Sequence, residues 1–196
     1  MRRIIFVVLG ALAVSITVWA QGGGAAPPAA LEAGASQADV DKALLAAPAG
    51  LRDQATVIKW KADQTYTTLR KGANGLVCYD RSGFPGHQPF AVQCTAMGNL
   101  PRVAQNLKAE ATGDRAKSEA MLKAMEADGT RAKPIFGSVW YHVSGQDKDH
   151  VGAHEITIAV PCATAASLGI PDKRSTDGVW IMNVGTSTAH IMIPGK

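Results

Sequence analysis

Several short runs of the chain are typical of β-strands, because they alternate apolar with polar residues or are rich in apolar and β-branched residues. The runs are residues 56–61, 66–71, 76–80, 135–143, 154–160, 179–184 and 189–193. Between the third and the fourth run, residues 99–129 repeat apolar side chains at a spacing of three or four, which predicts helix. A shorter helix is predicted at 37–47, where Ser36 precedes it as a cap.

The pair Asn74-Gly75 separates two of these strand-like runs, 66–71 and 76–80. Both residues tolerate a positive φ, so the pair predicts a tight hairpin. Most of the other links are too short for the crossover that parallel strands need. We therefore expect an α+β fold with a mainly antiparallel sheet and helices packed on one face.

Residues 1–20 have the layout of a secretory signal peptide, since Arg2 and Arg3 are followed by an uninterrupted apolar run to Ala20. The alternative is an uncleaved membrane anchor, because the run is near the lower length limit for crossing a bilayer. Residues 21–35, rich in Gly, Ala and Pro, predict a flexible linker, and 36–196 a single domain. We expect a periplasmic or secreted protein, which contacts the membrane only through the signal segment if that segment is not cleaved.

The charge of the chain excludes one class of partner. Its 196 residues include 20 Lys and Arg against 16 Asp and Glu, a net charge of +4. Without Arg2 and Arg3 the basic residues number 18, so the domain is close to neutral. No cluster of basic residues marks one face, and nucleic acid is not expected as a partner.

The chain has three cysteines, and in an exported protein they can form disulfides, because disulfides persist outside the cytoplasm. Cys78 and Cys94 flank a Gly- and Pro-rich segment with little predicted secondary structure, and a disulfide between them would close this loop. Cys162 is then left over, and we expect it to be a buried free thiol. The spacing alone leaves open its pairing with either of the other two cysteines.

His154, His190 and Met192 are the candidate metal ligands of the chain. His190 and Met192 are two residues apart on a predicted strand, so their side chains point to the same face. If the strands 154–160 and 189–193 are neighbours, His154 would join them at one end of the sheet. Imidazole with carboxylate suits a divalent metal such as zinc, and an added thioether favours copper. The alternative is that His154 pairs with a neighbouring carboxylate, and no other cofactor is predicted.

Signatures of the common enzyme classes are absent from the sequence, which has no GxSxG elbow, P-loop, dinucleotide fingerprint or HExxH motif. A weaker arrangement is His154 as a general base that Asp147 or Asp149 orients. No nucleophile can be identified beside it, so the catalytic residues of any enzyme are unknown. Core packing is the expected role of the tryptophans in predicted strands, which are Trp60, Trp140 and Trp180.

The segment from Thr68 to Cys78, TLRKGANGLVC, resembles the TLRKGxNGxxC motif of a family of small exported bacterial proteins usually described as hypothetical. Members of that family also carry a strand of the form HxxxxxVP and a terminal HxMxP, which match 154–161 and 190–194 here. The resemblance covers about residues 44–196. It implies export and a shared fold, without an assigned activity.

These features together predict an exported α+β domain without catalytic signatures. We expect a non-catalytic module that binds a small ligand or an envelope protein. The alternative is a metal-binding protein, or a metal-dependent enzyme, that uses His154 and His190.

Overall fold

The computed structural model describes residues 27–175 and 178–195. Its strands are β1 (Thr56–Trp60), β2 (Tyr66–Arg70), β3 (Leu76–Asp80), β4 (Phe90–Ala96), β5 (Val139–Gly145), β6 (Val151–Ala159), β7 (Trp180–Met182) and β8 (His190–Pro194). Its α-helices are α1 (Gln37–Ala43), α2 (Leu100–Glu110), α3 (Arg115–Ala127) and α4 (Ala165–Leu168). Short 3-10 helices are η1 (Leu44–Ala46), η2 (Ala49–Gln54) and η3 (Met97–Asn99).

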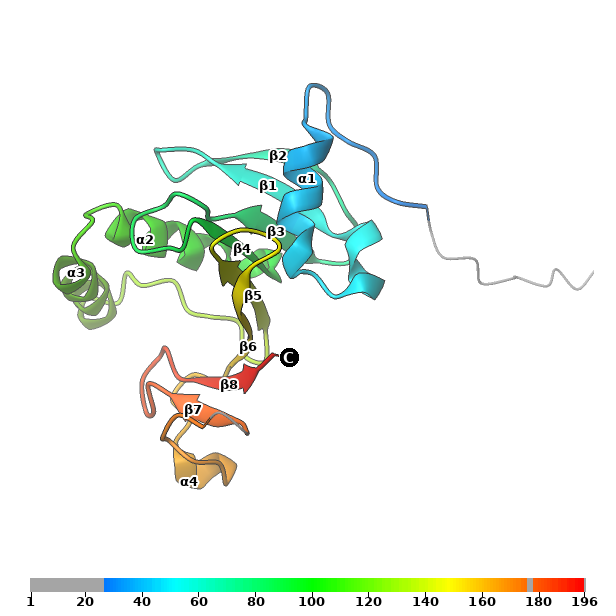
Figure 1. Cartoon of the computed structure of the whole chain (residues 1–196). Helices are drawn as coiled ribbons and strands as arrows, with labels where there is room; N and C mark the ends of the chain where they lie inside the picture. The colour runs from blue at the N-terminus through cyan, green and yellow to red at the C-terminus, as the bar shows by residue number, and fades with distance from the viewer. Residues whose placement is uncertain (1–26, 176–177, 196) are drawn as a thin grey trace, which may run out of the picture.

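The strands form one sheet in the order β2-β1-β3-β4-β5-β6-β8-β7 (Figure 1). The β1–β3 pair is parallel, whereas the other neighbouring pairs in the described chain are antiparallel. This arrangement confirms the predicted α+β class with a mainly antiparallel sheet.

The helices cover both faces of the sheet, where the sequence led us to expect one (Figure 1). Val57 and Ile58 are consecutive in β1, and both are buried. Val57 packs in the core that α1 and η1 cover, while Ile58 packs in a separate core on the other face. That second core contains the apolar stripe of α2, which is Leu100, Val103 and Leu107. Because both faces of the central strands are apolar, each face needs its own cover.

The predicted hairpin around Asn74-Gly75 is wrong. β1 lies between β2 and β3, so the segment that joins them crosses from one side of β1 to the other. Ala73 N–H and Asn74 N–H both donate to Gln54 O, at 2.9 and 3.1 Å. The Asn74 side chain also donates to Leu51 O at 2.8 Å. The Asn-Gly pair thus anchors a crossover, and the crossover lets the backbone groups on both edges of β1 pair with a strand.

A disulfide joins Cys78 of β3 to Cys94 of β4, as the sequence predicts. The two residues are directly opposite each other in the antiparallel ladder, with 4.0 Å between their Cα atoms. Sequence alone indicates little structure before Cys94, yet β4 occupies that stretch because Phe90, Val92 and Cys94 alternate into the core beneath α1 and η1. A disulfide-bonded pair is compatible with an exported protein.

Ahead of α1, the described chain already contacts the sheet. Glu32 N–H donates to Leu69 O at 2.9 Å, and Leu31 forms a bridge to Arg70. Part of the expected linker, residues 21–35, therefore pairs with the domain. The predicted signal peptide, residues 1–20, lies outside the described residues. Within the described ranges, no helix has the length and apolar character needed to span a membrane.

Past the strands that α1 and α2 cover, the sheet continues as β5, β6, β8 and β7 (Figure 1). Val160 and Ile181 are buried in a small core that also includes Ala165 of α4, on one face of this half. On the other face, α2, α3 and the segment 130–134 border the strands and leave a pocket between them. The open half of the sheet therefore forms one wall of this pocket.

We expect Gly72→Ala to destabilise the crossover strongly. A Cβ at this position would lie 2.1 Å from Gln54 O, and a backbone atom cannot move aside cheaply. Urea denaturation of the oxidised protein should show a loss of about 3 kcal/mol in the free energy of unfolding. Gly50→Ala is the control, since its Cβ meets nothing within 4 Å, and we expect a change below about 1 kcal/mol. Equal effects of the two substitutions would contradict the tight crossing.

Candidate functional site

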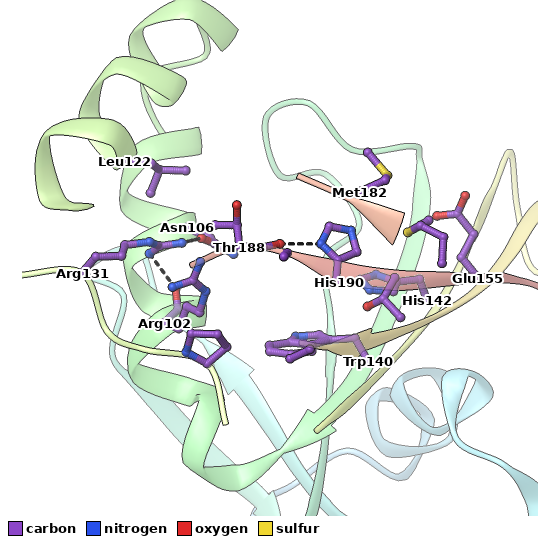
Figure 2. A pocket seen from close by; sticks show the side chains of 15 residues that line it. Arg102, Asn106, Leu122, Arg131, Trp140, His142, Glu155, Met182, Thr188 and His190 are labelled. Carbon is purple, nitrogen blue, oxygen red and sulfur yellow. Dashed lines mark hydrogen bonds between the residues drawn. The ribbon is translucent and has the colours of Figure 1, made fainter. Parts of the chain in front are cut away.

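A pocket of about 440 Å³ lies where the open half of the sheet meets α2 and α3 (Figure 2). Its strand wall consists of side chains that alternate toward one face, because residues two apart in a strand point the same way. These are Trp140 and His142 of β5, Glu155, Thr157 and Ala159 of β6, His190 and Met192 of β8, and Met182 of β7. The opposite wall includes Arg102 and Asn106 of α2, Leu122 of α3, and Arg131 and Pro134 of the segment that follows.

Two almost fully buried arginines form the helical end of the pocket. The side chain of Arg102 is 7% exposed and that of Arg131 is 3% exposed. Arg102 Nη1 donates to Ala132 O at 2.6 Å. Arg131 Nη1 donates to Gln105 Oε1 at 3.0 Å, and its Nη2 donates to Asn106 Oδ1. These bonds hold the segment after α3 against α2 and fix both guanidinium groups beside the pocket.

One carboxylate, that of Glu126, serves both guanidinium groups. Its Oε1 lies 3.7 Å from Arg102 Nη2 and 3.8 Å from Arg131 Nε, which is too far for hydrogen bonds. Glu110 is already paired with Arg81. Burial, and secondarily the charge of Arg102, lower the pKa of Arg131 to about 10, so the guanidinium stays charged at neutral pH. Among the described residues, this end of the pocket therefore holds two positive charges against the one negative charge of Glu126.

Trp140 presents an aromatic surface to the pocket. The buried Tyr79 donates through Oη to Gln93 Oε1 at 3.3 Å. Burial raises the pKa of Tyr79, so the phenol stays protonated and can donate this bond. Trp140 is half-buried, whereas Trp60 and Trp180 pack in the interior as expected.

His142 lines the middle of the strand wall, directly opposite Glu155 in the β5–β6 ladder. Burial is the main cause that lowers its pKa to about 4, and the charges of Arg81, His190 and His87 act in the same direction. The imidazole of His142 is therefore neutral at pH 7. It can bind a ligand through hydrogen bonds without adding a charge to the pocket.

His190, Met182 and Met192 meet at the strand end of the pocket. Met182 is opposite His190 in the β7–β8 ladder, and Met192 lies two residues further along the same face. His190 Nδ1 is 2.7 Å from the carbonyl oxygen of Thr188 (Figure 2). Since a carbonyl oxygen only accepts, Nδ1 is the donor, and Nε2 of the neutral ring keeps its lone pair for a ligand.

The structure brings the candidate metal ligands together only in part. His190 and Met192 both line the pocket, whereas His154 is exposed on the opposite face because the next residue, Glu155, faces the pocket. His154 also lies at the far end of the β6–β8 pair, where its carbonyl accepts from Gly195 N–H at 2.6 Å. Residues near the starts of two adjacent antiparallel strands lie at opposite ends of the pair, so His154 and His190 do not converge.

Asp147 and Asp149, the residues expected to orient His154 as a general base, pair with other side chains. Asp147 Oδ2 lies 2.9 Å from His150 Nδ1 in an exposed loop, and this hydrogen bond is the main cause that lowers the pKa of Asp147. Asp149 Oδ1 lies 2.7 Å from Lys148 Nζ. The structure therefore offers His154 neither of the two orienting carboxylates.

Over residues 27–175 and 178–195, no three His, Cys, Asp or Glu side chains are grouped to hold a metal ion. Cys162 has a free and exposed thiol, where the sequence led us to expect a buried one. It lies in a turn just after β6, with a φ of 64°.

Sequence reasoning missed the arginine end of the pocket. Arg102 and Asn106 are four residues apart, so a helix places them on the same flank. This spacing of four is the feature of the sequence that could have indicated that Arg102 and Asn106 lie side by side. Arg131 lies in a segment without periodicity, and tertiary folding alone brings it to α2.

The comparisons with known proteins identify no family for the chain. No protein-family model matches it, and no curated protein or solved structure matches it either. The resemblance to small exported bacterial proteins stays a prediction of the sequence motifs.

We expect His142 to titrate near pH 4 in the folded protein, against an ordinary value near 6.5. Between these values the unfolded chain binds the proton and the folded chain does not. The free energy of unfolding should therefore fall as the pH is lowered from about 6.5 to about 4. NMR titration of the imidazole protons measures the pKa, and His142→Gln identifies the resonance and removes this part of the pH dependence. A His142 resonance that titrates above pH 6 would contradict the buried, electropositive environment.

Proposed function

We propose that the protein is an exported, non-catalytic module that binds a small molecule in the pocket lined by β5, β6 and β8. The observation that carries this proposal is the pocket itself. Its volume of about 440 Å³ falls in the range of small-molecule sites. Polar groups are placed toward its two ends, with Trp140, Leu122 and Pro134 among the apolar groups of its lining. Such a lining favours a ligand with a polar group on an apolar body.

The pocket walls are held in place by contacts that need no ligand. The arginines are fixed by bonds to α2 and its neighbouring segment, and His190 by its bond to Thr188 O. A preformed site of this kind loses little conformational entropy when it binds. This supports a binding role on the scale of a metabolite.

Export of the module rests on two independent features. The apolar run after Arg2 and Arg3 predicts a secretory signal, and the Cys78–Cys94 disulfide suits an oxidising compartment. We place the protein in the periplasm or outside the cell on this basis.

Leu122→Trp tests the pocket directly. The larger side chain would project from α3 into the cavity and exclude a ligand, while Lys123→Trp adds the same ring at the next, exposed position of the helix. Native mass spectrometry of protein purified from the envelope of the organism that makes it should show a retained small molecule. We expect this added mass in the unsubstituted chain and in Lys123→Trp, and its loss in Leu122→Trp. A folded protein without added mass, or with a protein partner instead, would contradict the proposal.

The second candidate function is binding of Cu⁺ at the strand end of the pocket. The observation in its favour is His190, whose Nδ1–H bond to Thr188 O leaves Nε2 as the free ligand atom beside Met182 and Met192. Cu⁺ accepts thioether and imidazole ligands, whereas zinc is bound by thiolate, imidazole and carboxylate. The donor set therefore favours copper over zinc, with Met182 in the place that the sequence assigned to His154.

Anaerobic titration with Cu⁺ in competition with a chromogenic chelator measures this affinity. We expect about one equivalent to bind, and the double variant His190→Ala, Met192→Leu to weaken binding by about tenfold or more. His154→Ala is the control and should bind like the unsubstituted chain. Equal affinity of the double variant and the control would overturn the copper candidate.

A further inference from the structure

Among the described residues, the arginine end of the pocket holds more positive charge than negative charge. Arg102 and Arg131 share the single carboxylate of Glu126, which lies at 3.7 and 3.8 Å and also accepts a bond from Ser187. A buried charge is costly unless it is paired and hydrogen-bonded. The imbalance therefore favours an added negative charge at this end.

Arg131 also has unused donor capacity. Its Nε is buried and has no hydrogen-bond partner within the described ranges, although the side chain is only 3% exposed. Its two terminal nitrogens are already bonded to Arg102 O, Gln105 and Asn106. This Nε is the nitrogen that faces Glu126 Oε1 at 3.8 Å, so the long ion pair leaves it without a hydrogen bond.

Both guanidinium groups line the same cavity as an aromatic wall. Figure 2 shows Arg102, Arg131 and Asn106 grouped at one end, with Trp140 and His190 across the pocket from them. The neutral His142 adds no charge between the two ends. An elongated ligand would meet positive charge at one end and an aromatic surface further along.

We infer that the ligand is an organic oxyanion, with a carboxylate or phosphate bound at Arg102 and Arg131 and a flat apolar body against Trp140. Guanidinium groups bind either oxyanion through short, charge-assisted hydrogen bonds. The aromatic surface supplies the apolar contact that a free inorganic anion cannot use. This inference rests on the proposed function and names its ligand class.

Three probes with one ring system test the ligand class on the full chain: 2-naphthoate, 2-naphthyl phosphate and the neutral 2-naphthamide. Isothermal titration should show at least one anionic probe binding about tenfold or more tightly than the amide. The carboxylate and phosphate arms distinguish the two oxyanions. Inorganic phosphate alone should bind more weakly than the preferred naphthyl probe. An equal affinity for inorganic phosphate would overturn the aromatic part of the inference.

Glu126→Gln is a variant in which we expect the affinity for the anionic probe to increase. Removal of the shared carboxylate leaves both arginines free for the ligand, so the anionic probe should bind about threefold to tenfold more tightly. Glu119→Gln is the matched control, because it makes the same charge change on the exposed side of α3, where Glu119 pairs with Arg115. Arg102→Gln should weaken the anionic probe by about tenfold and leave the amide unchanged.

Equal affinity for the amide and the anions, with no response to Glu126→Gln, would overturn the inference while leaving a small-molecule site intact. Failure of every anionic probe to bind the folded chain would also overturn it. The proposed function is judged separately, by the small molecule that the protein retains and that Leu122→Trp removes.

Discussion

Val57 and Ile58 are neighbours in β1, point to opposite faces and are both buried, so the central strands must be covered twice. α1 and η1 supply one cover, and α2 supplies the other. A helix is about 10 Å wide and strands are about 4.8 Å apart, so one helix covers roughly two strands. With α2 packed against Ile58 and Tyr79, the same face of β6 and β8 is left without a helix directly above it. The pocket therefore results from the position of α2, which covers β1 and β3 and leaves β6 and β8 open.

The position of α2 also explains why charged residues are buried at the edge of that pocket. The stripe of Leu100, Val103 and Leu107 faces the core, and Arg102 and Asn106 lie on the flank beside it, toward the open strands. Arg131 then closes the gap by bonding to α2 from the segment after α3. The same contacts that fasten this segment to the helix hold the guanidinium groups in place. Any anion that binds there would stabilise the folded chain by mass action, so ligand binding and stability are coupled.

The residues of this chain show which features a sequence can specify and which it cannot. The period of two finds most strands, and it places His190 and Met192 on one face whatever the topology. The local signal of Asn74-Gly75 fails, because this segment bonds to the backbone of Gln54 and Leu51 and β1 pairs between β2 and β3. The grouping of His154 with His190 depended on strand direction and register, which no local pattern encodes. Arg131 is a still clearer case, since its role depends on a contact between segments about 25 residues apart in sequence.

The two ends of the pocket differ in chemistry, and this bears on whether the two candidate functions exclude each other. The arginine end is positive and suits hard oxygen donors, whereas His190, Met182 and Met192 offer soft nitrogen and sulfur. His142 lies on the strand wall between Trp140 and Glu155, and its lowered pKa keeps it neutral at pH 7. A cation at the strand end would attract an anion at the arginine end, and by linkage each would raise the affinity of the other. The two candidate functions thus draw on different residues of the pocket, so a ligand of one end does not use the contacts of the other.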